Sequence, residues 1–241
     1  MRLRICLVPA DGRDKAVIPF DFRRHFISLL KQLFEGSGVA ERFALERPGF
    51  SPYVFGVGFR RVVGWKSEEQ LLEVVPPVQM VISTGIPPVL TAAANGALRL
   101  YDRPAVLGLK VASLSVMPLR RLREETAVFR IAGHAVLRGK DGYLDPSASS
   151  PEEIAEAINT HMFKRLEFLS PDYLPPGRIS PVSVVPELSS LRKGVCAHYG
   201  GMITAVQGRI ALKGSPASLQ FLYDFGIGVR TGQGFGMLER V

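Results

Sequence analysis

GSPASLQFLYDFGIGVRTGQGFGMLERV, which runs from Gly214 to Val241, predicts a helix, a glycine-rich loop and a final strand. Gly214-Ser-Pro-Ala is typical of a helix start, because proline is tolerated in the first turn. The loop from Gly226 to Gly236 follows, and Met-Leu-Glu-Arg-Val has a strand-like pattern. A helix, a tight loop and a strand in this order are the closing elements of an α+β unit.

Two interpretations of the loop stay open from the residues alone. Glycine accepts positive φ and lets amide groups approach phosphates, while Arg230 and Thr231 add a cation and a hydroxyl. Alternatively, the glycines serve turn geometry only. The spacing excludes a P-loop and a dinucleotide fingerprint, because no Lys follows and the helix comes before the loop. The first interpretation therefore predicts a longer phosphodiester ligand, bound by Gly226, Gly228, Arg230, Thr231, Gly232, Gln233, Gly234 and Gly236.

Strand-like and helix-like patterns follow one another in the order β-α-β-β-α-β, twice. The first half contains a strand over 2–8, a helix over 22–35 with Asp21 as its N-cap, a hairpin over 51–64 and 71–82, a helix from Gly85 to Gly96, and an extended segment over 103–117. The second half contains a strand over 127–137, a helix from Ser150 to about Leu169, one or two strands over 195–212, and the closing elements. We expect an α+β protein with two tandem ferredoxin-like, RRM-like domains, residues 1–120 and 121–241. The aromatic signatures of RNA-recognition modules are missing, so base stacking on the sheet face is not expected.

Composition and charge narrow the function. The chain has 241 residues, a net charge of +8 and a pI near 9.8, and most of the surplus lies in residues 1–120. A basic surplus attracts polyanions. No stretch approaches the ~20 consecutive apolar residues of a membrane span, so we expect a cytoplasmic protein without membrane contact. Cys6 and Cys196 are too few ligands for a metal site, and none is expected.

Three segments together carry a resemblance to one family. They are Ile18-Pro-Phe with an amphipathic helix after a basic strand, Asp141-Gly-Tyr-Leu-Asp-Pro146 before a helix that contains Lys164-Arg165, and the C-terminal block. That block reads Ile203-Thr-Ala-Val-Gln-Gly208, then Gly214-Ser-Pro-Ala, then Gly-Ile-Gly and Gly-Phe-Gly-Met. The chain thus resembles the CRISPR repeat-processing endoribonucleases of the RAMP superfamily.

The resemblance implies a fold, a partner and a reaction. Two ferredoxin-like domains would bind CRISPR repeat RNA within precursor crRNA, in a basic cleft. Without a metal or other cofactor, the ribose 2′-hydroxyl would attack the adjacent phosphate and leave a 2′,3′-cyclic phosphate. Two alternatives remain: a weakly active or inactive repeat-binding scaffold, and a ferredoxin-like protein that binds a small molecule. A homodimer, and contacts with other proteins of a CRISPR interference complex, also stay open.

The catalytic candidates lie on the first predicted helix. The resemblance implies a histidine in or just after this helix, yet residues 36–43 contain none, and Lys31 stands where some members have tyrosine. His25 is the one histidine in this region. We therefore predict His25 as the acid or base and Lys31 as its electrostatic helper, with Arg23 and Arg24 holding RNA. His134, His161 and His198 are expected to be structural.

Overall fold

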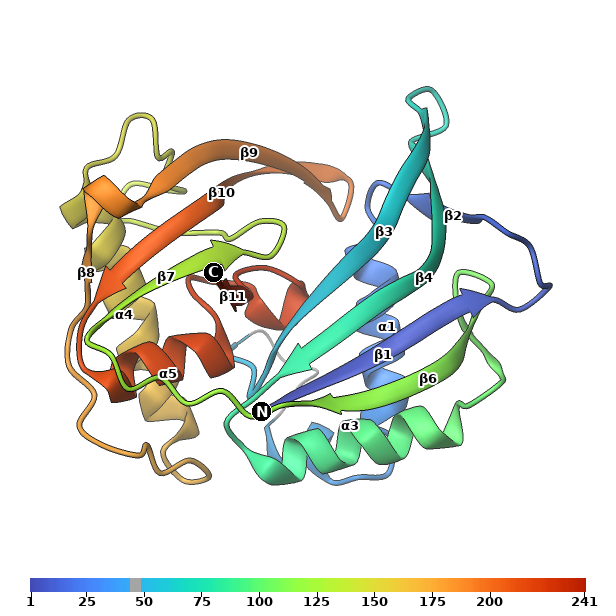
Figure 1. Cartoon of the computed structure of the whole chain (residues 1–241), viewed down its shortest axis with the longest axis horizontal. Helices are drawn as coiled ribbons and strands as arrows, with labels where there is room; N and C mark the ends of the chain where they lie inside the picture. The colour runs from blue at the N-terminus through green and yellow to red at the C-terminus, as the bar shows by residue number, and fades with distance from the viewer. Residues whose placement is uncertain (44–48) are drawn as a thin grey trace.

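The computed structural model describes residues 1–43 and 49–241. In this part of the chain the strands form two antiparallel sheets that lie side by side (Figure 1). The first sheet contains β1 (Arg2–Pro9), β2 (Ala16–Pro19), β3 (Val54–Lys66), β4 (Leu71–Ser83), β5 (Pro104–Val106) and β6 (Leu109–Met117). The second contains β7 (Thr126–Ile131), β8 (Ser183–Val184), β9 (Ser190–His198), β10 (Gly201–Lys213) and β11 (Leu238–Arg240). The proposed domain boundary at residue 120 falls between β6 and β7.

Both sheets have the strand order of a ferredoxin-like fold. In the first sheet β6, β1, β4 and β3 are neighbours, with β2 added along β4 and β5 along β6. In the second sheet β11, β7, β10 and β9 are neighbours, with β8 added along the end of β10. The helices are α1 (Arg23–Phe34), α2 (Val39–Arg42), α3 (Pro87–Arg99), α4 (Pro151–Leu169) and α5 (Pro216–Phe225). The predicted α+β class with tandem ferredoxin-like units is confirmed.

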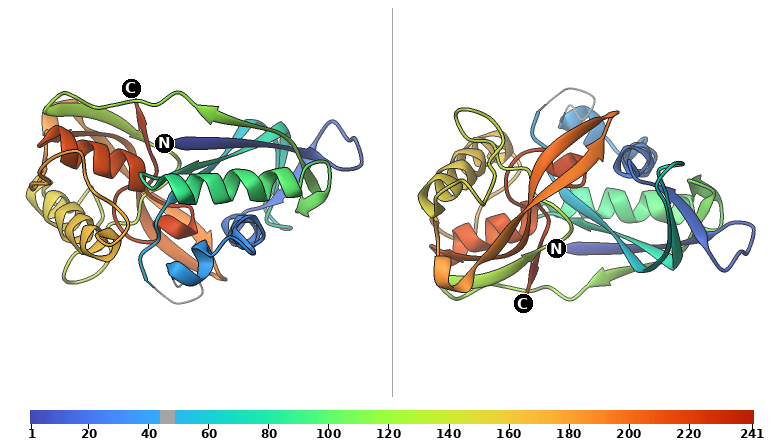
Figure 2. Two further views of the ribbon diagram at one scale, coloured as in Figure 1. Left: turned by 90° about the horizontal axis from the view of Figure 1, so that it is seen from below. Right: turned by 90° about the horizontal axis from the view of Figure 1, so that it is seen from above.

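The alternation of β1 and the helical stripe of α1 build the core of the first unit. Leu3, Ile5 and Leu7 are fully buried beneath α1 and α3, which cover one face of the sheet (Figure 2). On α1 the predicted stripe is buried from Phe26 to Leu33, because residues spaced by three or four share a helix face. Its polar face, including Lys31, is therefore left to the surface.

Two predicted helix ends are wrong, each for a physical reason. Asp21 does not cap α1; Phe22 occupies the N-cap, and the Asp21 carboxylate accepts a hydrogen bond from the Tyr199 amide at 2.9 Å. Gly96 does not end α3, which continues to Arg99. A Cβ at Gly96 would lie 2.0 Å from the Leu33 carbonyl oxygen, so glycine is required where α3 crosses α1. The extended segment 103–117 is also divided, into β5 and β6.

Candidate functional site

The glycine loop, residues 226–236, is held to the second sheet by its own backbone. The Ile227 amide donates to the Gly236 carbonyl at 2.9 Å, and the Gly236 amide donates to the His134 carbonyl at 2.8 Å. At Gly228, φ is +72° and a Cβ would lie 2.2 Å from the Val136 carbonyl oxygen. Close backbone packing therefore requires glycine there, as the turn-geometry interpretation expects.

Most of the loop is closed to a ligand. Gly226, Gly228, Gly234 and Gly236 are buried, and so is Thr231. The partly accessible residues gather at the middle of the loop and are Val229, Arg230, Gly232 and Gln233. A phosphate can therefore meet this middle segment rather than the full run of glycines that the sequence predicts.

Three buried arginines bind the backbone carbonyls of this C-terminal region. Arg2 donates to the Tyr223 and Leu238 carbonyls, and Arg23 donates from Nε to the Gly234 carbonyl at 3.2 Å. Arg165 donates to the carbonyls of Phe225, Gly226 and Gly228 at 2.7, 3.0 and 2.7 Å. Complete burial lowers the pKa of Arg165 to about 10, which leaves it charged at neutral pH. The three guanidinium groups therefore hold the loop and its flanking residues in place, because they donate hydrogen bonds to the backbone carbonyl oxygens there.

Arg230 is fixed at the surface of the loop by two polar neighbours. Its Nη1 donates to Gln233 Oε1 at 2.9 Å, and its Nη2 donates to the Tyr143 hydroxyl at 3.2 Å. Gln233 Oε1 also lies 2.9 Å from Nε2 of His198, a buried ring whose Nδ1 is 3.8 Å from Asp21. Burial lowers the pKa of His198, so this ring is neutral at pH 7 and donates to Gln233. The network preorganises the Arg230 cation for an anionic ligand.

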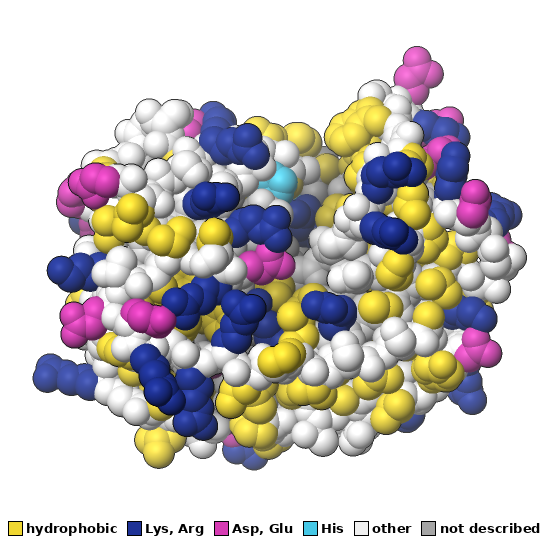
Figure 3. Space-filling model, viewed as in Figure 1, with side chains coloured by type: hydrophobic (Ala, Val, Ile, Leu, Met, Phe, Trp, Pro, Cys, Tyr) yellow, Lys and Arg dark blue, Asp and Glu magenta, His cyan; other side chains and the backbone are white. Residues whose placement is uncertain are grey.

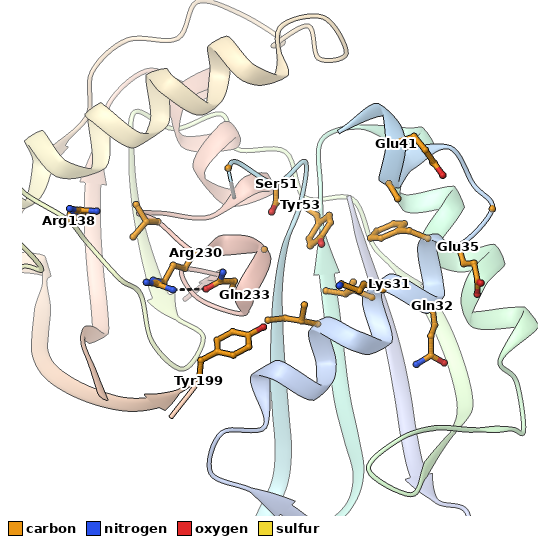
Figure 4. A pocket seen from close by; sticks show the side chains of 18 of the residues that line it. Lys31, Gln32, Glu35, Glu41, Ser51, Tyr53, Arg138, Tyr199, Arg230 and Gln233 are labelled. Atoms are coloured by element: carbon orange, nitrogen blue, oxygen red, sulfur yellow. Dashed lines mark hydrogen bonds between the residues drawn. The ribbon is translucent and has the colours of Figure 1, made fainter. Parts of the chain in front are cut away.

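A cleft of about 870 Å³ lies beside Arg230, between the two ferredoxin-like units. Lys31 on α1 and Arg230 on the loop stand on opposite sides of it (Figure 4). Tyr199, from the turn between β9 and β10, and Ser51 and Tyr53, before β3, also line it. The cleft therefore has cations from both units on its walls, as a binding site for a polyanion requires.

A second hollow of about 990 Å³ adjoins the cleft and shares Arg138, Tyr143 and Arg230 with it. Lys140, Lys164 and Arg165 add positive charge to its lining. On the face shown in Figure 3, Lys and Arg side chains also gather over the middle of the molecule, where the two halves meet. Carboxylates share these linings, so cations and acids alternate around the junction of the units; the acids are Glu35 and Glu41 in the cleft and Asp141, Asp145, Glu153 and Glu156 in the hollow.

The structure separates the residues predicted on α1. Lys31 is exposed and lines the cleft. Arg23 is buried, with its guanidinium 4.5 Å from the centre of the Phe235 ring. Arg24 is exposed and lies near Asp21 and His25, whose Nε2 is 3.3 Å from Arg24 Nε. Neither Arg24 nor His25 is among the residues that line the cleft.

The three cations predicted beside His25 do not act equally on it. Burial lowers its pKa first, the Arg24 charge lowers it further, and Asp21 opposes both. His25 is therefore neutral at pH 7, as a general base requires, but it stands outside the cleft.

Several site residues were not predicted. Tyr199, Arg138 and Ser51 lie in segments whose sequences carry no signal for the cleft. Tyr143 and Arg165 lie within the segments Asp141–Pro146 and Lys164-Arg165, which carry the family resemblance. The sequence therefore pointed to these segments but not to the role of either residue. Arg2 belongs to the predicted strand over 2–8, and a guanidinium that binds carbonyls 221 and 236 positions away has no local pattern.

The described residues contain neither a metal-ligand cluster nor a membrane-spanning helix. Within residues 1–43 and 49–241, no group of three or more His, Cys, Asp or Glu side chains is placed to hold a metal ion. In the same described ranges no helix has the length and apolar character needed to cross a membrane.

Comparison with solved structures supports the fold over the whole chain. A structure titled as the characterisation of a Cas6-related gene from Pyrococcus furiosus aligns with a TM-score of 0.77 and 20% identity, covering 100% of this chain and 98% of that one. A RAMP protein described as binding different RNA substrates aligns with a TM-score of 0.77 and 18% identity, over 100% and 99%. A Cas6 product complex aligns with a TM-score of 0.62 and 15% identity, over 100% of both chains.

Sequence comparison is informative for the C-terminal half. No curated protein matches the chain significantly. The family model described as "CRISPR associated protein Cas6, C-terminal" matches residues 122–240. These residues contain β7 to β11, the glycine loop and the arginine that fixes it. Residues 122–240 therefore contain a Cas6 C-terminal domain, and the whole chain has the fold of the Cas6 structures with which it aligns.

Proposed function

We propose that this protein binds CRISPR repeat RNA in the cleft and cuts it by attack of a ribose 2′-hydroxyl on the adjacent phosphate. The observation that carries the proposal is the placement of Lys31 and Arg230, from different units, on opposite walls of one cleft. Relatives with the same fold are described as binding RNA substrates or as product complexes. The Cas6 C-terminal match supports repeat RNA as the substrate and gives no support to small-molecule binding.

The reaction needs charge stabilisation and proton transfer. Lys31 supplies positive charge for the phosphorane, which is where negative charge develops, and Arg230 holds the RNA in place. A proton acceptor near the 2′-hydroxyl and a donor near the leaving 5′-oxygen each contribute about 10²–10⁴-fold. The described residues that line the cleft include no histidine, and His25 stands outside it. We therefore expect slow cleavage that relies mainly on positioning and electrostatics.

The same observation favours a second candidate, a repeat-binding protein that does not cut. A cleft with cations on both walls and no imidazole can hold RNA without transferring protons efficiently. Binding would then be the function, and other CRISPR proteins would use the bound repeat. This candidate shares the RNA site of the first and differs only in the chemistry.

One experiment separates the candidates. The purified protein is incubated in EDTA with the repeat RNA of its own host, and both binding and products are measured. A 5′-hydroxyl product and a 2′,3′-cyclic phosphate support metal-independent cleavage. Tight binding without product supports the second candidate, whereas absence of binding contradicts both.

A further inference from the structure

The β3–β4 hairpin extends beyond the body of the first sheet (Figure 1). Exposed apolar side chains lie near its tip. Trp65 is 66% exposed, and Val62 and Val63 are 46% and 39% exposed. Trp65 is also the only tryptophan in the chain. An exposed tryptophan on a projecting hairpin is costly in water and suggests a ligand that covers it.

Aromatic rings connect this tip to the cleft. Phe59, Val62 and Trp65 pair with Val78, Val74 and Leu72 of β4, and paired residues share a sheet face. The Trp65 ring lies 4.4 Å from the ring of Phe20, and the Phe59 ring lies 5.2 Å from that of Phe22. We call Phe20, Phe22, Phe59 and Trp65 the aromatic strip.

The strip begins where the cleft ends. Phe22 follows Asp21, whose carboxylate accepts the Tyr199 amide hydrogen at 2.9 Å, and Tyr199 lines the cleft. From Phe59 to Trp65 the strand covers roughly 20 Å at about 3.3 Å per residue. The Phe22 end of the strip is therefore next in sequence to the residue that holds the Tyr199 backbone, so the strip starts near this end of the cleft.

The strip is accompanied by positive charge. Arg60, Arg61 and Lys66 stand on the same strand and are exposed. Arg61 and Lys66 pair with Val75 and Leu71, so they lie on the sheet face opposite the strip. Lys66 approaches Glu69 and Glu73 at 4.0 and 3.7 Å, but in the described ranges neither Arg60 nor Arg61 forms an ion pair. Among the described residues β3 pairs with β4 alone and is an edge strand, with the exposed Trp65 ring on one face and cations on the other. A single-stranded nucleic acid that crosses this edge can stack a base on the ring while the cations neutralise its phosphates.

We propose that the aromatic strip binds the single-stranded RNA that flanks the repeat, with a base stacked on Trp65 and the RNA backbone crossing the edge of β3 toward Arg60 and Arg61. This inference rests on the proposed function, since it needs RNA in the cleft. It adds a second contact that depends on unpaired bases rather than on the repeat's sequence. A flanked repeat should then bind more tightly than a trimmed one.

The single tryptophan gives a direct readout. Fluorescence of the intact protein is titrated with its host's repeat RNA, with and without a single-stranded flank, and with oligo(A). We expect quenching by oligo(A) and by the flanked repeat, and much less by the trimmed repeat. In filter binding, Trp65→Ala should weaken the flanked repeat about tenfold, in the range of one stacked base, while Trp65→Phe stays close to wild type. Leu174→Ala, which truncates a 93% exposed side chain after α4, is the matched control.

The outcomes separate the two proposals. If RNA binds normally but does not quench the tryptophan, and Trp65→Ala keeps the wild-type affinity, the aromatic strip does not bind RNA. The proposed function is unaffected by that result. If Trp65→Ala instead changes only sedimentation, from dimer to monomer, the strip is a contact between two copies and the RNA assignment is wrong. Failure of the wild type to bind any repeat RNA overturns both proposals. A melting curve confirms that Trp65→Ala folds, and Trp65→Phe provides the test if it does not.

Discussion

Arg230 Nη1 donates a hydrogen bond to Gln233 Oε1 at 2.9 Å, so the cation that faces the cleft is fixed by a residue of its own loop. The backbone of Arg230 adopts φ of +60°, in the left-handed region, and the Tyr143 hydroxyl holds the other guanidinium nitrogen. A long flexible side chain is thereby ordered before RNA arrives, which reduces the entropy lost on binding.

Replacement of Arg230 by Ala should weaken RNA binding more than it slows the cleavage of bound RNA. We expect an affinity loss of about tenfold and a salt dependence whose slope falls by about one, since one phosphate contact is lost. Filter binding at several salt concentrations and single-turnover cleavage measure the two effects. Arg103→Ala, an exposed arginine after α3, loses the same charge and should change neither. A defect confined to the cleavage rate would contradict this assignment.

Among the buried arginines, replacement of Arg165 should lower the free energy of unfolding most. Its replacement by Met leaves the carbonyls of Phe225, Gly226 and Gly228 buried without their donor, and we expect a loss of about 3 kcal/mol in the free energy of unfolding. Urea denaturation measures it. Lys164→Met, on the exposed side of the same helix, is the control and should cost less than about 0.5 kcal/mol. A loss below about 1 kcal/mol for Arg165→Met would show that water replaces the guanidinium.

The sequence predicted the frame of this protein better than its site. Periodicity located α1, α4, α5 and most strands, because burial of one face imposes a pattern on neighbouring residues. Contacts between the units leave no such pattern. On a helical wheel Arg23 lies at the edge of the apolar stripe of α1, beside Leu30, but nothing there indicates that the loop of the other unit accepts its hydrogen bond at Gly234. The prediction that Gly96 ends its helix was wrong for the same reason, because this glycine makes room for the Leu33 carbonyl of α1.

His134 should make the protein less stable in mild acid. Burial, with the nearby Arg23 charge, lowers its pKa from 6.5 to about 4. The folded state therefore binds fewer protons than the unfolded chain between these values. The stability from the neutral ring is fully present above pH 6.5 and is lost as pH falls toward 4. His134→Gln should flatten the pH dependence of the urea midpoint in this window. An NMR titration that placed the His134 pKa near that of a free imidazole would refute the assignment.

The sequence and the structure favour different catalytic residues, His25 and Lys31. The resemblance places His25 first, whereas the cleft contains Lys31 and not His25. In single-turnover cleavage we expect Lys31→Ala to be slower by about 10- to 100-fold, in line with the loss of one group that stabilises the transition state. His25→Ala should stay within about threefold, with a melting curve to show that it folds. The reverse ranking would restore His25 as the acid or base and make Lys31 its helper.

A histidine introduced into the cleft should increase cleavage. Ala40 lies in α2, lines the same cleft as Lys31 and is half-buried, so a side chain there can reach the bound RNA. If proton transfer is what the wild type lacks, Ala40→His should accelerate single-turnover cleavage by about tenfold or more, since a well-placed acid or base contributes about 10²–10⁴-fold. The rate should also acquire a pH dependence near the histidine pKa of about 6.5. Ala40→Gln fills similar space without titrating and should leave the rate unchanged. If Ala40→His and Ala40→Gln cleave at equal rates and bind RNA with unchanged affinity, the missing imidazole does not limit cleavage. Slow turnover would then be explained by how the cleft positions the scissile phosphate.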